Sequence, residues 1–90
     1  MILPRQIKAA RALLGFGQNE LSDLAGVGIA TLKRIEASSE IRGAAATLWK
    51  IQTALEAAGI EFISAEGGKG PGVRLKEATS PAHKPKRRRK

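Results

Sequence analysis

The feature that most restricts how this chain can fold is a pair of short apolar segments separated by a glycine-containing turn. The stretch reads Q-N-E-L-S-D-L-A-G-V-G-I-A-T-L-K-R-I-E, from Gln18 to Glu36. Its apolar positions have helical spacing on both sides of the turn, at Leu21, Leu24 and Ala25 and at Leu32 and Ile35. Two helices of about two turns each are too short to be stable alone, so they must pack steeply against each other.

The turn itself, Gly26-Val27-Gly28, has two interpretations. Gly-x-Gly before a helix also occurs in phosphate-binding nucleotide loops, but those loops have a third glycine and follow a strand. Here Thr31 takes the place of the third glycine, and a helical stripe precedes the turn. The later G-G-K-G-P-G has no Ser or Thr after its lysine, as a P-loop would. We therefore interpret residues 18–36 as a helix-turn-helix, whose second helix can enter the major groove of DNA.

Helices are also predicted on both sides of this unit. The first has Pro4 in its first turn and Gly15 at its end, with one apolar face at Leu3, Ile7, Ala10 and Leu14. Residues 38–43 are predicted to be a loop. The last helix covers residues 44–58 and ends at Gly59, with an inward face at Leu48, Ile51 and Leu55.

After the last helix the apolar period changes from 3.6 to 2, which predicts two short strands. Residues 60–64 and 73–76 alternate, and a glycine-rich turn separates them, so a β-hairpin is expected. We divide the chain into a helical DNA-binding domain (1–59), a hairpin that is a candidate dimerisation element (60–76) and a disordered basic tail (77–90). The expected fold is mainly α, with four to five helices in a Cro/C1-repressor-like arrangement.

Composition argues against catalysis and metal binding. The 90 residues contain no cysteine, and the single histidine, His83, lies in the tail. Seven of the eight acidic residues, Glu36 among them, are expected on solvent faces. Ser22, a candidate nucleophile, has no obvious activating partner. We therefore expect no enzyme activity, no cofactor and no metal site, and the chain is too short for an inducer pocket of ordinary size.

The net charge of +8 is concentrated at the C-terminus. Residues 80–90 contain six basic residues and no acidic ones, whereas the preceding part has ten basic against eight acidic residues. The tail K-P-K-R-R-R-K is compatible with a flexible DNA-binding arm, a nuclear-localisation signal, or a partner-binding or inert terminus. We favour the DNA arm.

The N-terminal segment permits two interpretations as well. It is amphipathic and contains Arg5 and Arg11, like an organelle transit peptide, but it lacks serine, so a first core helix is favoured. Because no run of eighteen apolar residues exists, no membrane span is expected. The predicted location is the cytoplasm, in association with the nucleoid.

The stretch from Gln18 to Glu36 resembles the helix-turn-helix of the Xre/Cro/phage-repressor family. That family has Gln at the first position, Leu three residues later, Ala-Gly-Val at the turn, and a terminal Ile-Glu. The preceding A-R-A-L-L-G and the later A-L-E-A-A-G-I-E-F-I and G-P-G-V-R-L are similar to segments of small bacterial members. The resemblance extends from about Ile7 to Leu75 and implies a small bacterial transcriptional regulator.

The resemblance also implies roles for individual residues. Gln18 and Asn19 would contact phosphate at the start of the second helix, where the helix dipole attracts anions. The positions facing the major groove would be Gly28, Ile29, Ala30, Lys33 and Arg34, with Thr31 beside them and Arg42 placed to meet the DNA backbone. Many relatives have Ser or Thr where this chain has Gly17 and Gly28. The first groove positions are apolar here, so polar base recognition would fall to the two basic residues.

Two surface features keep alternatives open. Lys33 and Arg34 fit DNA contact better than a merely solvated helix face. Trp49 is expected to be half-buried, with a dimer contact as the less favoured interpretation, and the basic residues of the first helix lie on its wet side or contact the DNA backbone.

We expect a homodimeric repressor that binds an inverted-repeat operator in double-stranded DNA. One alternative is an antitoxin that binds DNA and a toxin protein. Another is a protein-interaction module that has lost DNA binding.

Overall fold

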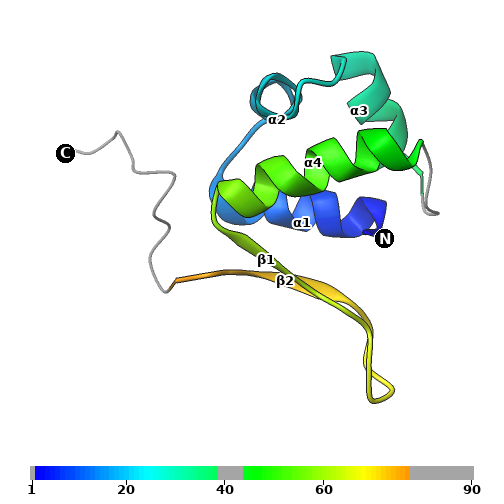
Figure 1. Cartoon of the computed structure of the whole chain (residues 1–90), viewed down its shortest axis with the longest axis vertical. Coiled ribbons are helices and arrows are strands. Elements are labelled where there is room, and N and C mark those ends of the chain that lie inside the picture. Colours follow the sequence, from blue (N-terminus) through cyan, green and yellow to red (C-terminus); the bar gives the residue numbers. More distant parts are fainter. Residues whose placement is uncertain (1, 39–43, 78–90) are drawn as a thin grey trace.

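Four helices and one β-hairpin follow each other along the residues that the computed structural model describes, 2–38 and 44–77 (Figure 1). The elements are α1 Pro4–Leu14, α2 Gln18–Ala25, α3 Ile29–Glu36, α4 Ala45–Ala57, β1 Ile60–Ile63 and β2 Gly72–Leu75. The predicted mainly α fold with a short C-terminal hairpin is confirmed. Most of the predicted loop 38–43 and of the predicted tail lies outside the described residues. No helix in the described ranges is both long and apolar enough to cross a membrane.

The first two helices begin without a polar side chain at the N-cap. Their N-caps are Leu3 and Gly17, and in each case the side chain three residues later accepts a hydrogen bond from the N-cap N–H. Leu3 N donates to Gln6 Oε1 at 2.8 Å, and Gly17 N donates to Glu20 Oε1 at 2.9 Å. This contact is one half of a capping box, and it pairs the N-cap N–H at both helix starts.

A single aliphatic core joins the helices. Its buried members come from every helix, from β1 and from the residues that flank α1 and α4. They are Ile2, Ile7, Ala10, Leu14, Leu21, Ala25, Leu32, Ile35, Leu48, Ile51, Leu55, Ala58 and Ile60. Full burial of a Leu or Ile side chain stabilises the fold by roughly 1.5–3 kcal/mol. The two-turn helices α2 and α3 therefore depend on this shared core and not on their own backbone hydrogen bonds.

Helix α4 lies across the middle of the molecule. In Figure 1, α2 and α3 lie on one side of α4, and α1 and the hairpin lie on the other. This layout leaves one long face of α4 turned away from the core. The helix-turn-helix and the hairpin are therefore at opposite ends of the molecule.

The hairpin is attached to the helices by polar contacts as well as by packing. Its register pairs Ile60 with Leu75, and the half-buried residues Phe62, Val73 and Leu75 pack against the core. Gln6 Nε2 donates to Gly72 O at 3.0 Å, and Lys76 Nζ donates to the Glu56 carbonyl at the end of α4 at 2.8 Å. A two-stranded hairpin is marginal alone, so these anchors explain why it is ordered here.

Trp49 is more exposed than predicted, and one residue of the predicted apolar stripe lies outside the core. Leu24 was expected in the apolar stripe of the second helix and Trp49 was expected to be half-buried, but they are 57% and 64% exposed. In α2 the buried face is Leu21, Ser22 and Ala25, which turns Leu24 about 100° away from the core. In α4 the core face is Leu48, Ile51 and Leu55, and Trp49 lies on the opposite side.

Candidate nucleic-acid interface

The turn between α2 and α3 depends on one glycine. Gly26 has φ +72°, in the left-handed region, and its N–H donates to Ser22 O at 2.9 Å. Gly28 has an ordinary extended conformation, and a Cβ added there would come no closer than 3.9 Å to Thr31 Oγ1. The first glycine is therefore required by the turn, whereas the second is compatible with a side chain. The helix-turn-helix geometry predicted for residues 18–36 is present.

Helix α3 has a sharply divided surface. Leu32, Ile35 and Glu36 are buried against the rest of the domain. Ala30, Lys33 and Arg34 are exposed, and Ile29 and Thr31 flank them at intermediate exposure. Neither Lys33 nor Arg34 forms an ion pair within the described part of the chain. The outward face of α3 therefore consists of small or apolar side chains with two unpaired cations.

Eight of the predicted site residues lie in the described helix-turn-helix, and the ninth lies outside the described residues. The start of α2 contributes Gln18 and Asn19, and the turn contributes Gly28. The residues from α3 are Ile29, Ala30, Thr31, Lys33 and Arg34. Arg42 lies outside the described residues.

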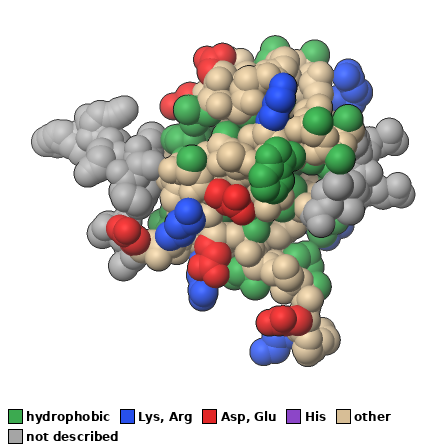
Figure 2. Space-filling view, in the orientation of Figure 1, with side chains coloured by type: hydrophobic (Ala, Val, Ile, Leu, Met, Phe, Trp, Pro, Cys, Tyr) green, Lys and Arg blue, Asp and Glu red, His purple; other side chains and the backbone are tan. Residues whose placement is uncertain are grey.

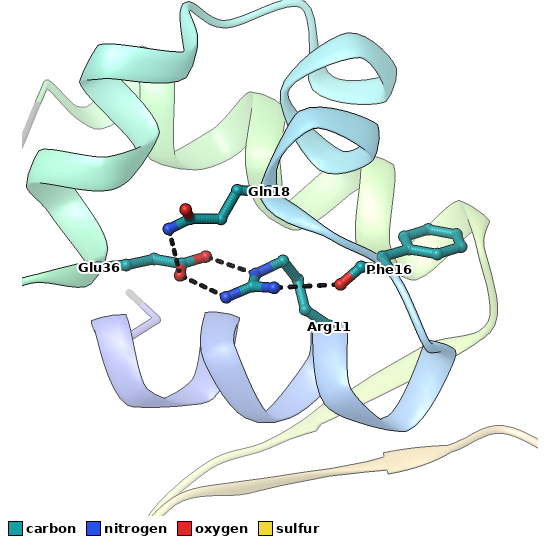
Figure 3. Close-up of polar contacts among 4 residues, drawn as sticks. All are labelled: Arg11, Phe16, Gln18 and Glu36. Atoms are coloured by element: carbon teal, nitrogen blue, oxygen red, sulfur yellow. Dashed lines mark hydrogen bonds and ion pairs between the residues drawn. The ribbon is translucent and has the colours of Figure 1, made fainter.

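The geometry of this unit is fixed by a carboxylate at the end of α3 (Figure 3). Arg11 Nε donates to Glu36 Oε2 at 2.9 Å, and Arg11 Nη2 donates to Glu36 Oε1 at 2.8 Å. Gln18 Nε2 donates to the same Oε1 at 3.0 Å, and Arg11 Nη1 donates to Phe16 O at 3.0 Å. One carboxylate therefore joins α1, the first residue of α2 and the last residue of α3.

This ion pair is largely removed from water. The Glu36 side chain is 2% exposed and that of Arg11 is 20% exposed. The hydrogen bonds to Glu36 raise the pKa of the Arg11 guanidinium above its ordinary value, against the opposing effect of burial. The bidentate geometry is the strongest arrangement of such a pair and also the most directional. It therefore resists any change in the angle between α2 and α3.

The environments expected for two charged residues are wrong, and a third residue has an additional contact. Glu36 was expected on a solvent face, and it is one of the most deeply buried polar residues described. Arg11 was expected on the wet side of α1 or at the DNA backbone, and it is instead bound to Glu36. Gln18 keeps its predicted position at the start of α2, but one amide hydrogen is already committed to Glu36. Its contact with a phosphate stays a prediction.

The comparisons with known proteins give no family. No protein-family model matches the chain, and no curated protein is significantly similar to it. The resemblance to the Xre/Cro/phage-repressor family therefore rests on the motif residues, and the function has to be argued from the geometry above.

Proposed function

We propose that this chain is a sequence-specific DNA-binding regulator that reads duplex DNA with the outward face of α3. The observation that carries the proposal is the pair of exposed cations Lys33 and Arg34 on the second helix of a helix-turn-helix, which form no ion pair with any described residue. A helix with solvated cations is common, but here the buried Arg11–Glu36 pair also holds that helix rigidly. Rigid presentation matters because base contacts require a fixed register between helix and groove.

The dimensions and residue sizes of α3 suit a major groove. Eight residues form a helix about 12 Å long, comparable to the roughly 12 Å width of the B-DNA major groove. Ala30 and Ala37 lie seven residues apart, at the centre of the outward face, and both are exposed. Their small side chains permit close approach to the base edges, while Lys33 and Arg34 project on either side.

The chemistry of these side chains indicates what would be read. Arg34 can form a bidentate hydrogen bond with guanine O6 and N7, the commonest specific contact in the major groove. Ile29 and Ala30 offer no hydrogen bond but can contact thymine methyl groups. We therefore expect a half-site that contains at least one G·C pair next to A·T pairs.

One such helix covers only a few base pairs, so useful specificity requires two. In helix-turn-helix dimers the two recognition helices enter successive major grooves about 34 Å apart. The proposed form is thus a homodimeric repressor on an inverted repeat, acting in the cytoplasm of a bacterial cell. An antitoxin that also binds a toxin protein is a second candidate, because Leu24 and Trp49 leave an apolar surface open to a protein partner.

Selection of bound sequences from a random duplex pool tests the proposal. The full chain should enrich an inverted repeat, and the double variant Lys33→Ala/Arg34→Ala should bind it about 5- to 150-fold more weakly. Lys69→Glu is the matched control, because it lowers the net charge by the same two units at an exposed position in the hairpin turn. The control should retain the preference for the selected duplex. Retention of that preference by the double variant would refute the assignment of α3.

A further inference from the structure

Among the described residues, the two most exposed large apolar side chains, Leu24 and Trp49, line the same depression, although they belong to different helices. They line a depression of about 400 Å³ between α2 and α4, together with Ala25, Lys50, Thr53, Ala54 and Ala57. A second depression of about 240 Å³ shares Leu24, Ala54 and Ala57 with the first and adds Phe16 and Ala58. The two form one continuous apolar groove. Figure 2 shows hydrophobic side chains over α2 and α4 on the face toward the viewer.

Contiguous exposed apolar surface of this kind marks an interaction site in a small protein. The exposed members Leu24, Trp49, Lys50, Thr53 and Ala57 are called the Trp49 face below. We propose that the Trp49 face binds a second copy of this chain, by antiparallel packing of α4 against α4 around a twofold axis beside Thr53. This face would be the interface of the dimer that the proposed function requires. Only the relative orientation of the two copies rests on that proposed function.

Self-complementarity is the first reason for choosing a second copy. Trp49, Thr53 and Ala57 are spaced four residues apart, so they form a stripe along α4 directly opposite its core face. The large indole and the small Ala57 side chain are about 12 Å apart along the helix. A twofold axis beside Thr53 reverses one α4 relative to the other. Trp49 of each copy then lies beside the end of the other α4 that contains Ala57, where the second depression is.

The side chains that line the groove also restrict the occupant. Among the described residues that line the groove, Lys50 is the one charged side chain, and no carboxylate is present. The basic 80–90 segment of this chain has no apolar residue larger than alanine or proline to fill the groove. A second Trp49 face offers an indole and a leucine side chain, which match the lining.

Orientation is the third reason, and it does depend on the proposed function. Helices α2 and α3 lie on the same side of α4 (Figure 1). A twofold axis that is perpendicular to α4 and directed toward α2 and α3 leaves both helix-turn-helix units on the same side of the dimer. That arrangement is needed for both copies to bind one duplex.

The expected dimer is weak. Trp49 is 64% exposed, so it can remove about 150 Å² from water in each copy, on the basis of the 150–250 Å² that a buried aromatic covers. Two copies supply about 300 Å², roughly a quarter of the 1,200 Å² at the lower limit of stable interfaces. The rest must come from the neighbouring small side chains. We therefore expect weak association, with the aromatic side chain as the main anchor.

Sedimentation equilibrium of the full chain without DNA tests the proposal, over roughly 5–500 µM to bracket a weak interface. The wild type should pass from monomer to dimer, and Trp49→Ala should weaken association at least about tenfold. Thr53→Arg should abolish it, because two cations would meet at the twofold axis. Since the chain has one tryptophan, its fluorescence emission should also shift to shorter wavelength as the dimer forms.

Leu13→Ala is the matched control, because Leu13 is also an exposed apolar residue, 44% accessible, but does not line the groove. It should leave the dimer unchanged, and far-UV circular dichroism should show that all variants are folded. A monomer at every concentration, or a dimer that tolerates both Trp49→Ala and Thr53→Arg, would overturn the proposal. A dimer that enriches no DNA sequence would contradict the proposed function and leave the interface standing.

Discussion

Replacement of Arg11 by methionine should destabilise the domain more than replacement of its partner Glu36 by glutamine. Arg11→Met keeps an unbranched apolar side chain but leaves a carboxylate that is 2% exposed without its cation. Glu36→Gln leaves the guanidinium unpaired, but that side chain is 20% exposed and still donates to Phe16 O. The two substitutions break the same ion pair, and they differ in how well water can reach the charge that remains.

Burial sets the expected magnitudes. Removal of one partner from a buried ion pair costs about 3–5 kcal/mol, and we take about 3 kcal/mol for Arg11→Met because the pair is partly solvated. Glu36→Gln should cost about 1–2 kcal/mol, since the amide oxygen can still accept hydrogen bonds. A domain of this size has a total stability of about 4–11 kcal/mol. The melting temperature of Arg11→Met should therefore fall by roughly 10–20 °C.

Urea unfolding followed by far-UV circular dichroism is the appropriate assay, because the single tryptophan is already 64% exposed and would report unfolding poorly. The double variant Arg11→Met/Glu36→Gln removes both charges and should be more stable than the sum of the two losses implies. The reasoning is refuted if Arg11→Met costs less than about 1 kcal/mol or if the two losses simply add.

Three other outcomes follow from local geometry. Gly26→Ala should destabilise the domain by about 1–2 kcal/mol, because alanine must adopt the left-handed conformation. Gly28→Ser should be neutral or slightly stabilising, because serine is a good helix N-cap and the position has room for a side chain. Urea unfolding of both variants measures the difference. The hydrogen bonds from Arg74 lower the pKa of Glu61, so their stabilisation is present at neutral pH and is lost as the pH falls through that lowered pKa. An NMR titration should give a midpoint below the ordinary value, and the midpoint should rise in Arg74→Gln. Gln6→Ala removes the contact with β2, so amide hydrogen exchange should accelerate in the hairpin by about fivefold or more while the α4 core amides change less.

Local patterns in the sequence were enough to predict the helices and strands. Gly15 ends α1 and Gly26 forms the turn because a left-handed residue is needed at each place, and glycine adopts that conformation without strain. The period change after Gly59 marks the hairpin, whose observed strands differ from the predicted ones by one residue at their ends. Helix ends, turns and the change of period depend only on residues that are close in the sequence, so a single sequence is enough to predict them.

Side-chain partners between elements could not be predicted. Arg11 and Glu36 are 25 residues apart, and no local pattern distinguishes a buried pair from two solvated charges. The exposure of Leu24 also depends on which face of α2 packs against the core. Ser22 is buried in α2 and its hydroxyl is paired with Asn19 O, whereas Leu24 in the same helix is exposed. The predicted contacts between the α3 surface and DNA stay predictions.

The most direct test of the account is an NMR titration of the isotope-labelled full chain with the duplex obtained by selection. We predict the largest amide shift changes at the exposed positions of α3, Ala30, Lys33 and Arg34, and at the first residues of α2. Changes at the hairpin should be small. If the largest changes fall instead on the hairpin or on the residues of the Trp49 face, α3 is not the reading helix and the central claim is wrong.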